Sequence, residues 1–418
     1  MPSMVAVSIV AILILTIFGL AVISSICTLY LGSNGGPLIT YTLSISTKDV
    51  GQLASLGENP LVFTTHDTVV VNPLSPKVNV TSLDARKNFV VNPLSPKMNV
   101  TYVNALLPLR DFELTPRALQ FEGRVREFIR SEDCRRGNHF FITWISPVVG
   151  FDDREFLVFD SLFKTNPEGC LVILSNTMDS EEGRRILNPL TEGGYRILAV
   201  TPDLPFLLEG TPGSRWFQDL KEGKVAPGFV SLAQNLSNLM RLAYLYKYGG
   251  VYLDTDVIVL KSFQGLRNVI GAQSETKERW TRLNNAVLVF DKGHPLVLEF
   301  ITEFARTFNG SKWGHNGPNL VSRVVERAEL KGDTNFTVLP PSRFYPVNWV
   351  KITRYFNRPM NVDDEEWVEA KVAWLREWTY GLHLWNKQSR SLKVEEGSVI
   401  DRLVKENCVL CREVVYRS

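Results

Sequence analysis

The sequence predicts an α/β domain built on a mostly parallel sheet with helices on both faces. Three short apolar runs, 140–145, 170–174 and 195–200, have the length and composition of buried strands. Between the first two, residues 153–164 repeat apolar side chains at helical spacing. This β-α-β rhythm is typical of parallel sheets, in which ligands bind beyond the carboxyl ends of the strands.

The size and charge of the chain limit the classes of partner. Its 418 residues are enough for one large domain with appended segments. The 46 basic and 44 acidic residues leave a net charge of +2, and no stretch is both basic and rich in aromatic residues. Such a balance produces no strong field for nucleic acid or acidic lipid. We therefore expect no nucleic-acid partner.

An uncharged, apolar run extends from Val5 to Leu31. A helix of about 20 apolar residues crosses a bilayer, whereas the apolar core of a cleaved signal peptide has about 7–15 residues. The length of the run therefore favours residues 1–31 as a short cytoplasmic leader followed by an uncleaved transmembrane signal anchor. A cleaved signal peptide, cut near the small residues Ser24 and Ser25, is the alternative.

Residues 32–130 have the composition of a poorly ordered stalk, rich in Ser, Thr, Asn and Pro. The octapeptide Val-Val-Asn-Pro-Leu-Ser-Pro-Lys occurs at 70–77 and again at 90–97, and each copy is followed by an Asn-Val-Thr sequon. Its prolines exclude a central strand or a helix interior. An amphipathic piece at 118–129 leads from the stalk into the domain, which we expect to span 139–418.

Glycosylation sequons and cysteines indicate a lumenal fate for the chain after the anchor. A sequon at Asn235 falls in a predicted buried helix, and the sequons expected to be used are those of Asn79, Asn99, Asn309 and Asn335. The cysteines beyond the apolar run are even in number, which is compatible with two disulfides of undetermined connectivity. They are Cys134, Cys170, Cys408 and Cys411. The C-terminal pair could also form a zinc half-site or remain as free thiols.

A helix and two strands predicted in succession carry a pair of carboxylates. The helix, 231–248, ends at a glycine pair that can adopt a left-handed cap, and short apolar runs flank Asp254 and Asp256. Alternate residues of an extended segment point the same way, so both carboxylates can face one opening. Because burying unpaired carboxylates is costly, a divalent Mg²⁺ or Mn²⁺ with a diphosphate would stabilise them. The acidic run 363–366 is instead predicted to begin a solvated helix.

This stretch resembles a known family. Residues 238–256 contain Asn-Leu-Met-Arg and then Leu-Tyr-Lys-Tyr-Gly-Gly-Val-Tyr-Leu-Asp-Thr-Asp, which is similar to the DXD sugar-binding region of the α1,4-glycosyltransferases. That family includes globotriaosylceramide synthase and α1,4-N-acetylglucosaminyltransferase. Its further motifs are matched by Leu-Asn-Asn-Ala at 283–286, Trp-Gly-His-Asn-Gly-Pro at 313–318 and His-Leu-Trp-Asn-Lys at 383–387. The resemblance covers nearly all of 139–411 and is strongest to the plant branch.

The resemblance implies a GT-A fold, a UDP-sugar donor, Mn²⁺ and retention of the anomeric configuration. It implies that Asp256 binds the metal directly, that Asp254 contacts the donor partly through the metal, and that His383 is a further candidate ligand. The donor-binding residues that it implies are Thr143, Trp144, Asn238, Arg241, Tyr252, Asn284, Asn285, His315, Asn316, Gly317, Trp385 and Asn386. Relatives commonly carry Asp at the position of Asn238, which leaves the identity of the donor open.

The activity implied is transfer of a hexose or N-acetylhexosamine from a UDP-sugar to a glycan or glycolipid hydroxyl, in an α1,4-type linkage. Such an enzyme would be a single-pass type II protein of the Golgi membrane with a lumenal catalytic domain, and the anchor or stalk could support homo-oligomers. A metal would stabilise the departing diphosphate as a Lewis acid, and attack on the same face needs no enzyme nucleophile. A GDP-mannose-dependent mannosyltransferase and a catalytically inactive sugar-binding or scaffold protein are the alternatives.

Overall fold

The computed structural model describes residues 26–31, 39–44, 115–135 and 137–411. The chain divides into two units, Met1–Asn92 and Pro93–Ser418. In the first unit, strand β1 (Ile26–Leu31) pairs antiparallel with β2 (Ile39–Ser44). Both strands are rich in Ile, Thr and Tyr, which favour extended structure. The last residues of the predicted anchor therefore form a strand rather than the end of a helix.

The other residues of the predicted anchor, 1–25, lie outside the described residues, together with most of the predicted stalk. The octapeptide repeats and the sequons at Asn79 and Asn99 are in that part of the chain. Within the described ranges, none of the helices combines the length and the apolar character that a membrane span requires.

The folded domain begins earlier than the expected residue 139. Helices α4 (Pro116–Leu119) and α5 (Phe121–Arg130) lie in the range that composition assigns to the stalk. Phe121 and Val125 of α5 are fully buried in the main core, and α5 packs against the central sheet. The amphipathic spacing of this segment thus outweighs its polar composition, because its apolar face has a sheet to cover.

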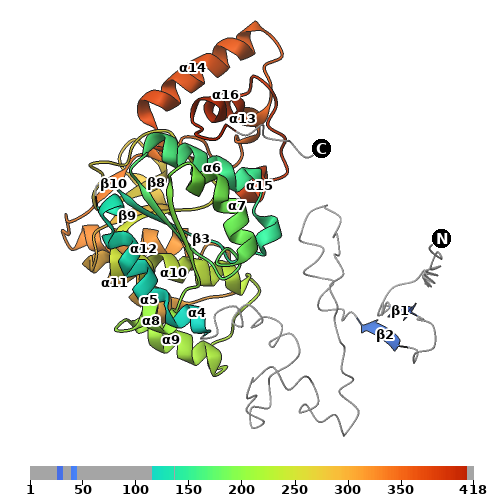
Figure 1. Cartoon of the computed structure of the whole chain (residues 1–418), viewed down its shortest axis with the longest axis vertical. Helices are drawn as coiled ribbons and strands as arrows, with labels where there is room; N and C mark the ends of the chain where they lie inside the picture. The colour runs from blue at the N-terminus through green and yellow to red at the C-terminus, as the bar shows by residue number, and fades with distance from the viewer. Residues whose placement is uncertain (1–25, 32–38, 45–114, 136, 412–418) are drawn as a thin grey trace. The chain divides into compact units, whose positions relative to one another are not determined.

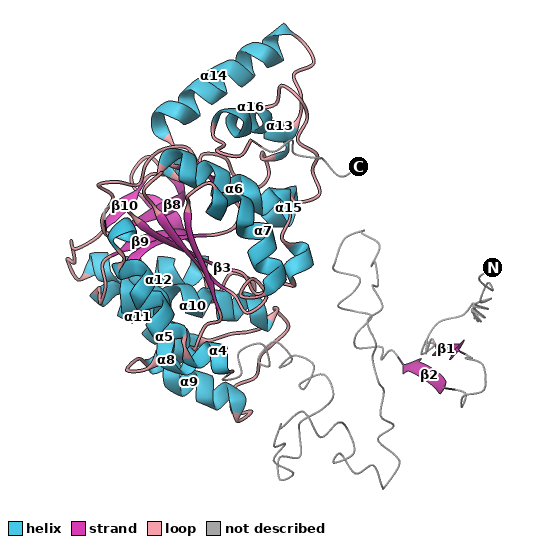
Figure 2. Ribbon diagram, in the orientation of Figure 1, coloured by secondary structure: helices cyan, strands magenta, loops and turns pink. Residues whose placement is uncertain are grey.

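A mostly parallel sheet forms the centre of the domain, as predicted (Figure 2). In the described part of the chain its strand order is β10-β8-β9-β6-β3-β4-β5. The strands are β3 (His139–Thr143), β4 (Cys170–Leu174), β5 (Arg196–Val200), β6 (Gly250–Leu253), β8 (Val269–Glu275), β9 (Trp280–Phe290) and β10 (Thr337–Leu339). Strands β5, β4, β3 and β6 are parallel, whereas β9 runs antiparallel to both β6 and β8. The carboxyl ends of β3 and β6 therefore meet at one edge.

Helices cover both faces of this sheet (Figure 1). Helices α6 (Asp153–Thr165) and α7 (Glu181–Glu192) lie over one face, and α10 (Leu232–Tyr248), α11 (Pro295–Thr307) and α12 (Pro318–Leu330) lie over the other. The short α8 (Leu204–Leu208) packs against α10, and α9 (Pro212–Lys221) packs against α11. Side chains alternate along β3: Phe141 enters the core shared with α10, α11 and α12, and Phe140 and Ile142 enter the core shared with α6 and α7. Burial on both faces explains why the predicted strands are continuous apolar runs.

The predicted glycine cap at the end of α10 is present. Gly249 has a φ of 74°, and its N–H donates to the carbonyl of Leu245 at 2.8 Å. Gly250 has a φ of 109°, and a Cβ there would lie 2.5 Å from the carbonyl oxygen of His139. Only glycine fits this backbone without strain, so the pair lets β6 begin directly after the helix and beside β3.

The C-terminal third, whose topology the sequence does not indicate, forms a further core. Strands β7 (Val257–Val259) and β11 (Gly381–His383) form an antiparallel pair that packs against three helices. These are α13 (Thr353–Phe356), α14 (Val362–Trp378) and α16 (Val399–Glu406), and the short α15 (Asn386–Ser389) follows β11. The acidic run 363–366 lies at the start of α14, as predicted. The strand after Asp256 therefore leaves the central sheet and pairs with the strand that carries His383.

Two disulfides among the described residues answer the question of connectivity that the sequence leaves open. Cys134 pairs with Cys170, and Cys408 pairs with Cys411, so the C-terminal cysteines form a disulfide rather than a zinc half-site.

The sequon asparagine Asn235 is buried in α10, as expected. The sequon asparagines Asn309 and Asn335 are exposed.

Candidate active site

A cleft of about 720 Å³ opens where β3 and β6 end, beside the N-terminal half of α10. Its wall includes polar residues of the sheet, of α10 and of the segment that follows β11. The sequence-predicted residues in the lining are Thr143, Trp144, Asn238, Arg241, Asp254, Asp256, Asn284, Asn285, Asn316, His383, Trp385 and Asn386. Residues from four separate motifs thus converge on one cavity.

Asp254 directly follows β6 and is held by Arg241. Nη1 of Arg241 lies 3.0 Å from Oδ1 of Asp254, and the hydroxyl of Tyr252 donates to the same oxygen. Burial raises the pKa of Asp254, and the positive charge of Arg241 opposes that effect. The carboxylate is therefore fixed in direction while its second oxygen remains available to a ligand.

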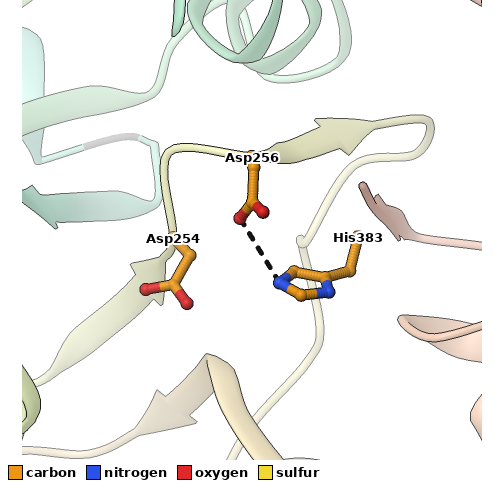
Figure 3. A group of neighbouring side chains, drawn as sticks. All are labelled: Asp254, Asp256 and His383. Atoms are coloured by element: carbon orange, nitrogen blue, oxygen red, sulfur yellow. Dashed lines mark ion pairs between the residues drawn. The ribbon is translucent and has the colours of Figure 1, made fainter. Parts of the chain in front are cut away.

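Asp256 and His383 form a buried pair (Figure 3). Oδ1 of Asp256 lies 3.3 Å from Nε2 of His383, and Oδ2 accepts a hydrogen bond of 2.8 Å from the backbone N–H of Asn386. Burial by itself would raise the pKa of Asp256, but the charge of His383 and these hydrogen bonds lower it. In turn Asp256 raises the pKa of His383 against the effect of burial.

Asp254, Asp256 and His383 together fit a divalent cation. Each offers a donor atom, and the three atoms lie within 4.8 Å of one another (Figure 3). Carboxylate oxygens and an imidazole nitrogen are ligands that Mn²⁺ and related ions accept. The ring of His383 presents Nε2 to the carboxylates (Figure 3), whereas Nδ1 is buried and has no hydrogen-bond partner among the described residues. The donor set matches the metal site that the resemblance implies.

Arg241 forms the floor of the cleft behind Asp254. It is 2% exposed, Nη1 donates to the carbonyl of Asn285 at 2.7 Å, and Nε donates to the carbonyl of Ser237 at 3.2 Å. The guanidinium also lies 4.3 Å from the centre of the Tyr252 ring. Each donor of the fork therefore has a defined partner, which a lysine could not reproduce.

Amide side chains continue the floor beyond Arg241. Nδ2 of Asn285 donates to Oδ1 of Asn238 at 2.8 Å, and Nδ2 of Asn284 donates to Oε1 of Gln273 at 3.0 Å. Gln273 also lines the cleft, although sequence analysis did not single it out. Gly317 packs behind the first pair, and a Cβ there would lie 2.9 Å from Oδ1 of Asn238. The motif glycine thus leaves space for the amides.

Tyr252, His315 and Gly317 lie outside the described lining of the cleft. Tyr252 is buried behind Asp254. Nε2 of His315 lies 2.8 Å from the carbonyl oxygen of Thr307 and so contacts its own loop. Asn316 is in the lining, but its Nδ2 donates to Oδ1 of Asn235 at 2.9 Å. In this structure these four residues support the cleft wall.

Trp385 packs against His383, the candidate metal ligand. Its backbone is left-handed, with a φ of 57°, and its indole N–H donates to the carbonyl of Val347 at 2.8 Å. The indole meets the ring of His383 edge to face, with 4.3 Å between the ring centres. At the other end of the cleft, Trp144 is buried, and its indole N–H has no partner in the described structure.

Hydrogen bonds and ion pairs that the motifs do not indicate join the α15 segment to the start of α6. Arg154 is buried and donates to the carbonyl and the hydroxyl of Ser389 at 2.6 and 2.7 Å. Arg390 pairs with Glu155 at 2.5 Å. The signal in the sequence is the capping box formed by Asp152 and Glu155, which fixes the beginning of α6. These contacts hold the backbone that carries Trp385 and Asn386.

Comparisons with known proteins identify the family of the chain. A glycosyltransferase sugar-binding region containing the DXD motif matches residues 152–277, and the alpha 1,4-glycosyltransferase conserved region matches residues 289–415. An uncharacterized protein of Arabidopsis thaliana is 32% identical over 308 residues, which are 71% of this chain and 46% of that protein. The chain therefore spans about half the length of this relative.

Other relatives have named activities. The lactosylceramide 4-alpha-galactosyltransferase of Pongo pygmaeus is 36% identical over 203 residues, which are 47% of this chain and 85% of the relative. The human alpha-1,4-N-acetylglucosaminyltransferase is 28% identical over 219 residues, which are 49% of this chain and 58% of the relative. With both conserved regions matched in order along one folded domain, the chain belongs to the family of DXD-containing α1,4-glycosyltransferases.

Proposed function

We propose that this protein is a metal-dependent glycosyltransferase that moves a hexose or N-acetylhexosamine from a UDP-sugar to a glycan or glycolipid hydroxyl. The observation that carries the proposal is the convergence of Asp254, Asp256 and His383 in one polar cleft at the carboxyl edge of the sheet. Ligands of open α/β sheets bind at such an edge. The arrangement fits the GT-A fold implied by the family.

The proposed donor lies along the cleft. Thr143 ends β3, Trp144 follows it, and both would contact the nucleotide base, because both belong to the lining of the cleft. The amide pair of Asn238 and Asn285 lies beyond Arg241 and would hydrogen-bond the hydroxyl groups of the sugar. The diphosphate then lies beside Asp256, between the two ends.

In the proposed mechanism Asp254, Asp256 and His383 hold Mn²⁺ or a similar cation. Such an ion, when bound, supplies Lewis-acid stabilisation of the charge that develops on the leaving diphosphate. Arg241 keeps Asp254 oriented, and Trp385 keeps the imidazole of His383 in place. Fixing these groups before the reaction avoids reorganisation when charge develops.

Retention of the anomeric configuration is also part of the proposal. In the described lining of the cleft the acidic side chains are Asp254 and Asp256, which are both placed at the metal position. No further carboxylate of this lining is free to act as a nucleophile. Attack by the acceptor hydroxyl on the face from which the diphosphate leaves is therefore favoured over a covalent intermediate.

We further propose a single-pass type II protein of the Golgi membrane, with an N-terminal anchor that ends before β1 and a glycosylated stalk that could support homo-oligomers. The Cys134–Cys170 and Cys408–Cys411 disulfides support an oxidising compartment. The exposed sequons at Asn309 and Asn335 support passage through the secretory pathway. The α1,4-type linkage rests on the named relatives.

The test is hydrolysis of a donor panel by the full chain, with UDP-galactose, UDP-N-acetylglucosamine, UDP-glucose and GDP-mannose, in Mn²⁺ and in EDTA. We expect hydrolysis of at least one UDP-sugar that stops in EDTA and returns with Mn²⁺. Hydrolysis of GDP-mannose alone would replace the proposal by a mannosyltransferase. Absence of hydrolysis, with no metal-dependent nucleotide binding, would indicate an inactive sugar-binding protein.

A further inference from the structure

The mouth of the cleft carries exposed indoles that the proposed donor does not use. Trp313, in the loop between α11 and α12, is 59% exposed, and Trp349, in the loop before α13, is 40% exposed. Both belong to the lining of the cleft. Nζ of Lys387 lies 4.2 Å from the centre of the Trp313 ring. Large aromatic surfaces left open beside an active site indicate a binding surface.

These indoles lie close to the reacting centre. Trp349 meets Trp385 edge to face at 5.7 Å between ring centres, and Trp385 meets His383 in the same way at 4.3 Å. Lys387, which contacts Trp313, follows Asn386, whose backbone N–H donates to Asp256. A molecule resting on the indoles is therefore adjacent to the metal-binding group and to the donor sugar.

The cationic side chain of Arg282 is on the same wall. Nη2 of Arg282 donates to Oδ1 of Asn319 at 2.7 Å, and the backbone N–H of Asn319 donates to the carbonyl of Gly314, next to Trp313. Arg282 is exposed, and no carboxylate of the described residues lies within ion-pair distance of it. Its remaining donors are free for oxygen atoms of a ligand.

We infer that Trp313, Trp349 and Arg282, which we name the acceptor rim, form the acceptor subsite and bind a sugar ring of the acceptor. This inference rests on the proposed function. A pyranose has a C–H-rich face that packs on an indole and a ring of hydroxyl groups that accept from Arg and amide donors. The acceptor rim offers both kinds of surface beside the reacting centre.

The composition of the rim favours a carbohydrate over a lipid tail. An alkyl chain gains free energy from a continuous apolar groove, because its stabilisation scales with the apolar area buried. The lining that contains the two indoles also contains the polar side chains of Arg282, Asn319 and Gln388, so it is not a continuous apolar groove. The acceptor class that follows is a glycan, or a glycolipid recognised through its sugar head group.

The experiment compares two rates of the full-length enzyme. Hydrolysis of the donor uses water and does not need the acceptor rim, whereas transfer to lactose, lactosylceramide or p-nitrophenyl hexosides does. We expect Trp313→Ala to raise the acceptor KM by about tenfold, the size of a lost aromatic stacking contact. Donor hydrolysis and donor KM should stay unchanged, and Trp313→Phe should restore most of the acceptor affinity.

Trp374→Ala is the matched control. Trp374 is a tryptophan of α14 that is 36% exposed, with Nζ of Lys371 at 5.2 Å from its ring, and it is outside the described lining of the cleft. Trp374→Ala should change neither the rate of donor hydrolysis nor the rate of transfer to the acceptor. Equal acceptor KM in Trp313→Ala and the parent enzyme would overturn the inference, and so would transfer that requires the lipid tail.

The same experiment distinguishes a failure of the acceptor rim from a failure of the proposed function. If the parent enzyme hydrolyses no donor, the proposed function fails. If it hydrolyses a donor but uses none of the acceptors, binding of the parent and of Trp313→Ala to a glycan array decides. Glycan binding that Trp313→Ala loses would support the acceptor rim, and absence of glycan binding by the parent would overturn it.

Discussion

Nε2 of His383 lies 3.3 Å from Oδ1 of Asp256, and this contact is a consequence of strand pairing outside the central sheet. Asp256 immediately precedes β7, His383 ends β11, and the two strands pair antiparallel with His383 opposite Val257. The backbone N–H of Leu384 donates to the carbonyl of Asp256 at 2.8 Å. The backbone pairing of β7 with β11 therefore sets the position of His383, the third candidate metal ligand, beside Asp256.

Arg241→Lys should weaken both the fold and the activity. A lysine keeps the charge but cannot contact Asp254, Asn285 and Ser237 at once, as the guanidinium does. We expect a loss of about 2 kcal/mol in the free energy of unfolding, because a buried ion pair is disturbed. Donor hydrolysis should fall by about 100-fold or more, because Asp254 loses its orientation. Urea denaturation and steady-state kinetics measure the two effects.

The control for this variant is Arg215→Lys, at an exposed arginine that pairs with Asp219 on the surface of α9. It should leave stability and kinetics at the level of the parent. Parent-like hydrolysis by Arg241→Lys would show that the guanidinium fork has no part in the site.

Gly317→Ala should weaken donor binding with little change in stability. The added Cβ would lie 2.9 Å from Oδ1 of Asn238 and 3.2 Å from the amide of Asn285, so it displaces the pair that we place against the donor sugar. We expect the KM of the donor to rise while the melting temperature stays within a few degrees. Gly123→Ala is the control, since a Cβ there meets no atom within 4 Å. An unchanged KM would place the donor sugar elsewhere.

Glu303 should make stability depend on pH. It is 3% exposed and pairs with Arg306, Arg323 and Arg327 at 2.8, 3.0 and 2.7 Å. Burial by itself would raise the pKa of Glu303, but hydrogen bonds from the three guanidinium groups lower it from 4.5 to about 2. A depressed carboxyl pKa stabilises the fold above the ordinary pKa, and this stabilisation is lost as the pH falls from 4.5 towards 2.

Glu303→Gln should therefore lower the free energy of unfolding by about 2–3 kcal/mol at pH 7 and by much less near pH 2. Urea denaturation across this pH range measures the difference. Glu299→Gln, which removes an exposed carboxylate 3.9 Å from Lys331, should have no measurable effect. If the free energies of unfolding of the parent and of Glu303→Gln differed by the same amount at all pH values, the depressed pKa of Glu303 would be contradicted.

A fragment that begins at residue 139 should be much less stable than one that begins at residue 110. The shorter fragment lacks the buried Phe121 and Val125, and it lacks Cys134, which leaves Cys170 unpaired. Losing a buried aromatic side chain alone costs about 3 kcal/mol or more. Melting temperatures of the two fragments test this expectation. Equal values would mean that α5 adds nothing to the domain and that the sequence-based boundary is adequate.

The sequence predicts the elements whose signals are local. The run 170–174 coincides with β4, and the periodic segment that ends at Gly249 is α10, because both are marked by their own apolar pattern and by glycine. A local pattern also predicts that Asp254 and Asp256 lie at the end of a strand. Both aspartates lie in the cleft lining, and the family resemblance is confirmed by the matched conserved regions.

What the sequence does not predict depends on contacts between distant segments. The β8–β9 hairpin places Gln273 beside Asn284, but neither residue has a neighbour in the sequence that indicates the pairing. Arg154 similarly has no motif, although it anchors Ser389 beneath the site. The polar composition of residues 32–130 assigns the amphipathic piece containing Phe121 to the stalk, whereas its burial depends on one apolar helix face that packs on the sheet.

The central claim is that Asp256 binds a metal ion that a nucleotide shares. Titration calorimetry of UDP binding, with and without Mn²⁺, tests it on the parent protein, on Asp256→Asn and on the control Asp363→Asn at the exposed start of α14. The parent and the control should bind UDP at least about tenfold more tightly in Mn²⁺, and Asp256→Asn should lose this enhancement. The same Mn²⁺ dependence in Asp256→Asn as in the parent would contradict the claim.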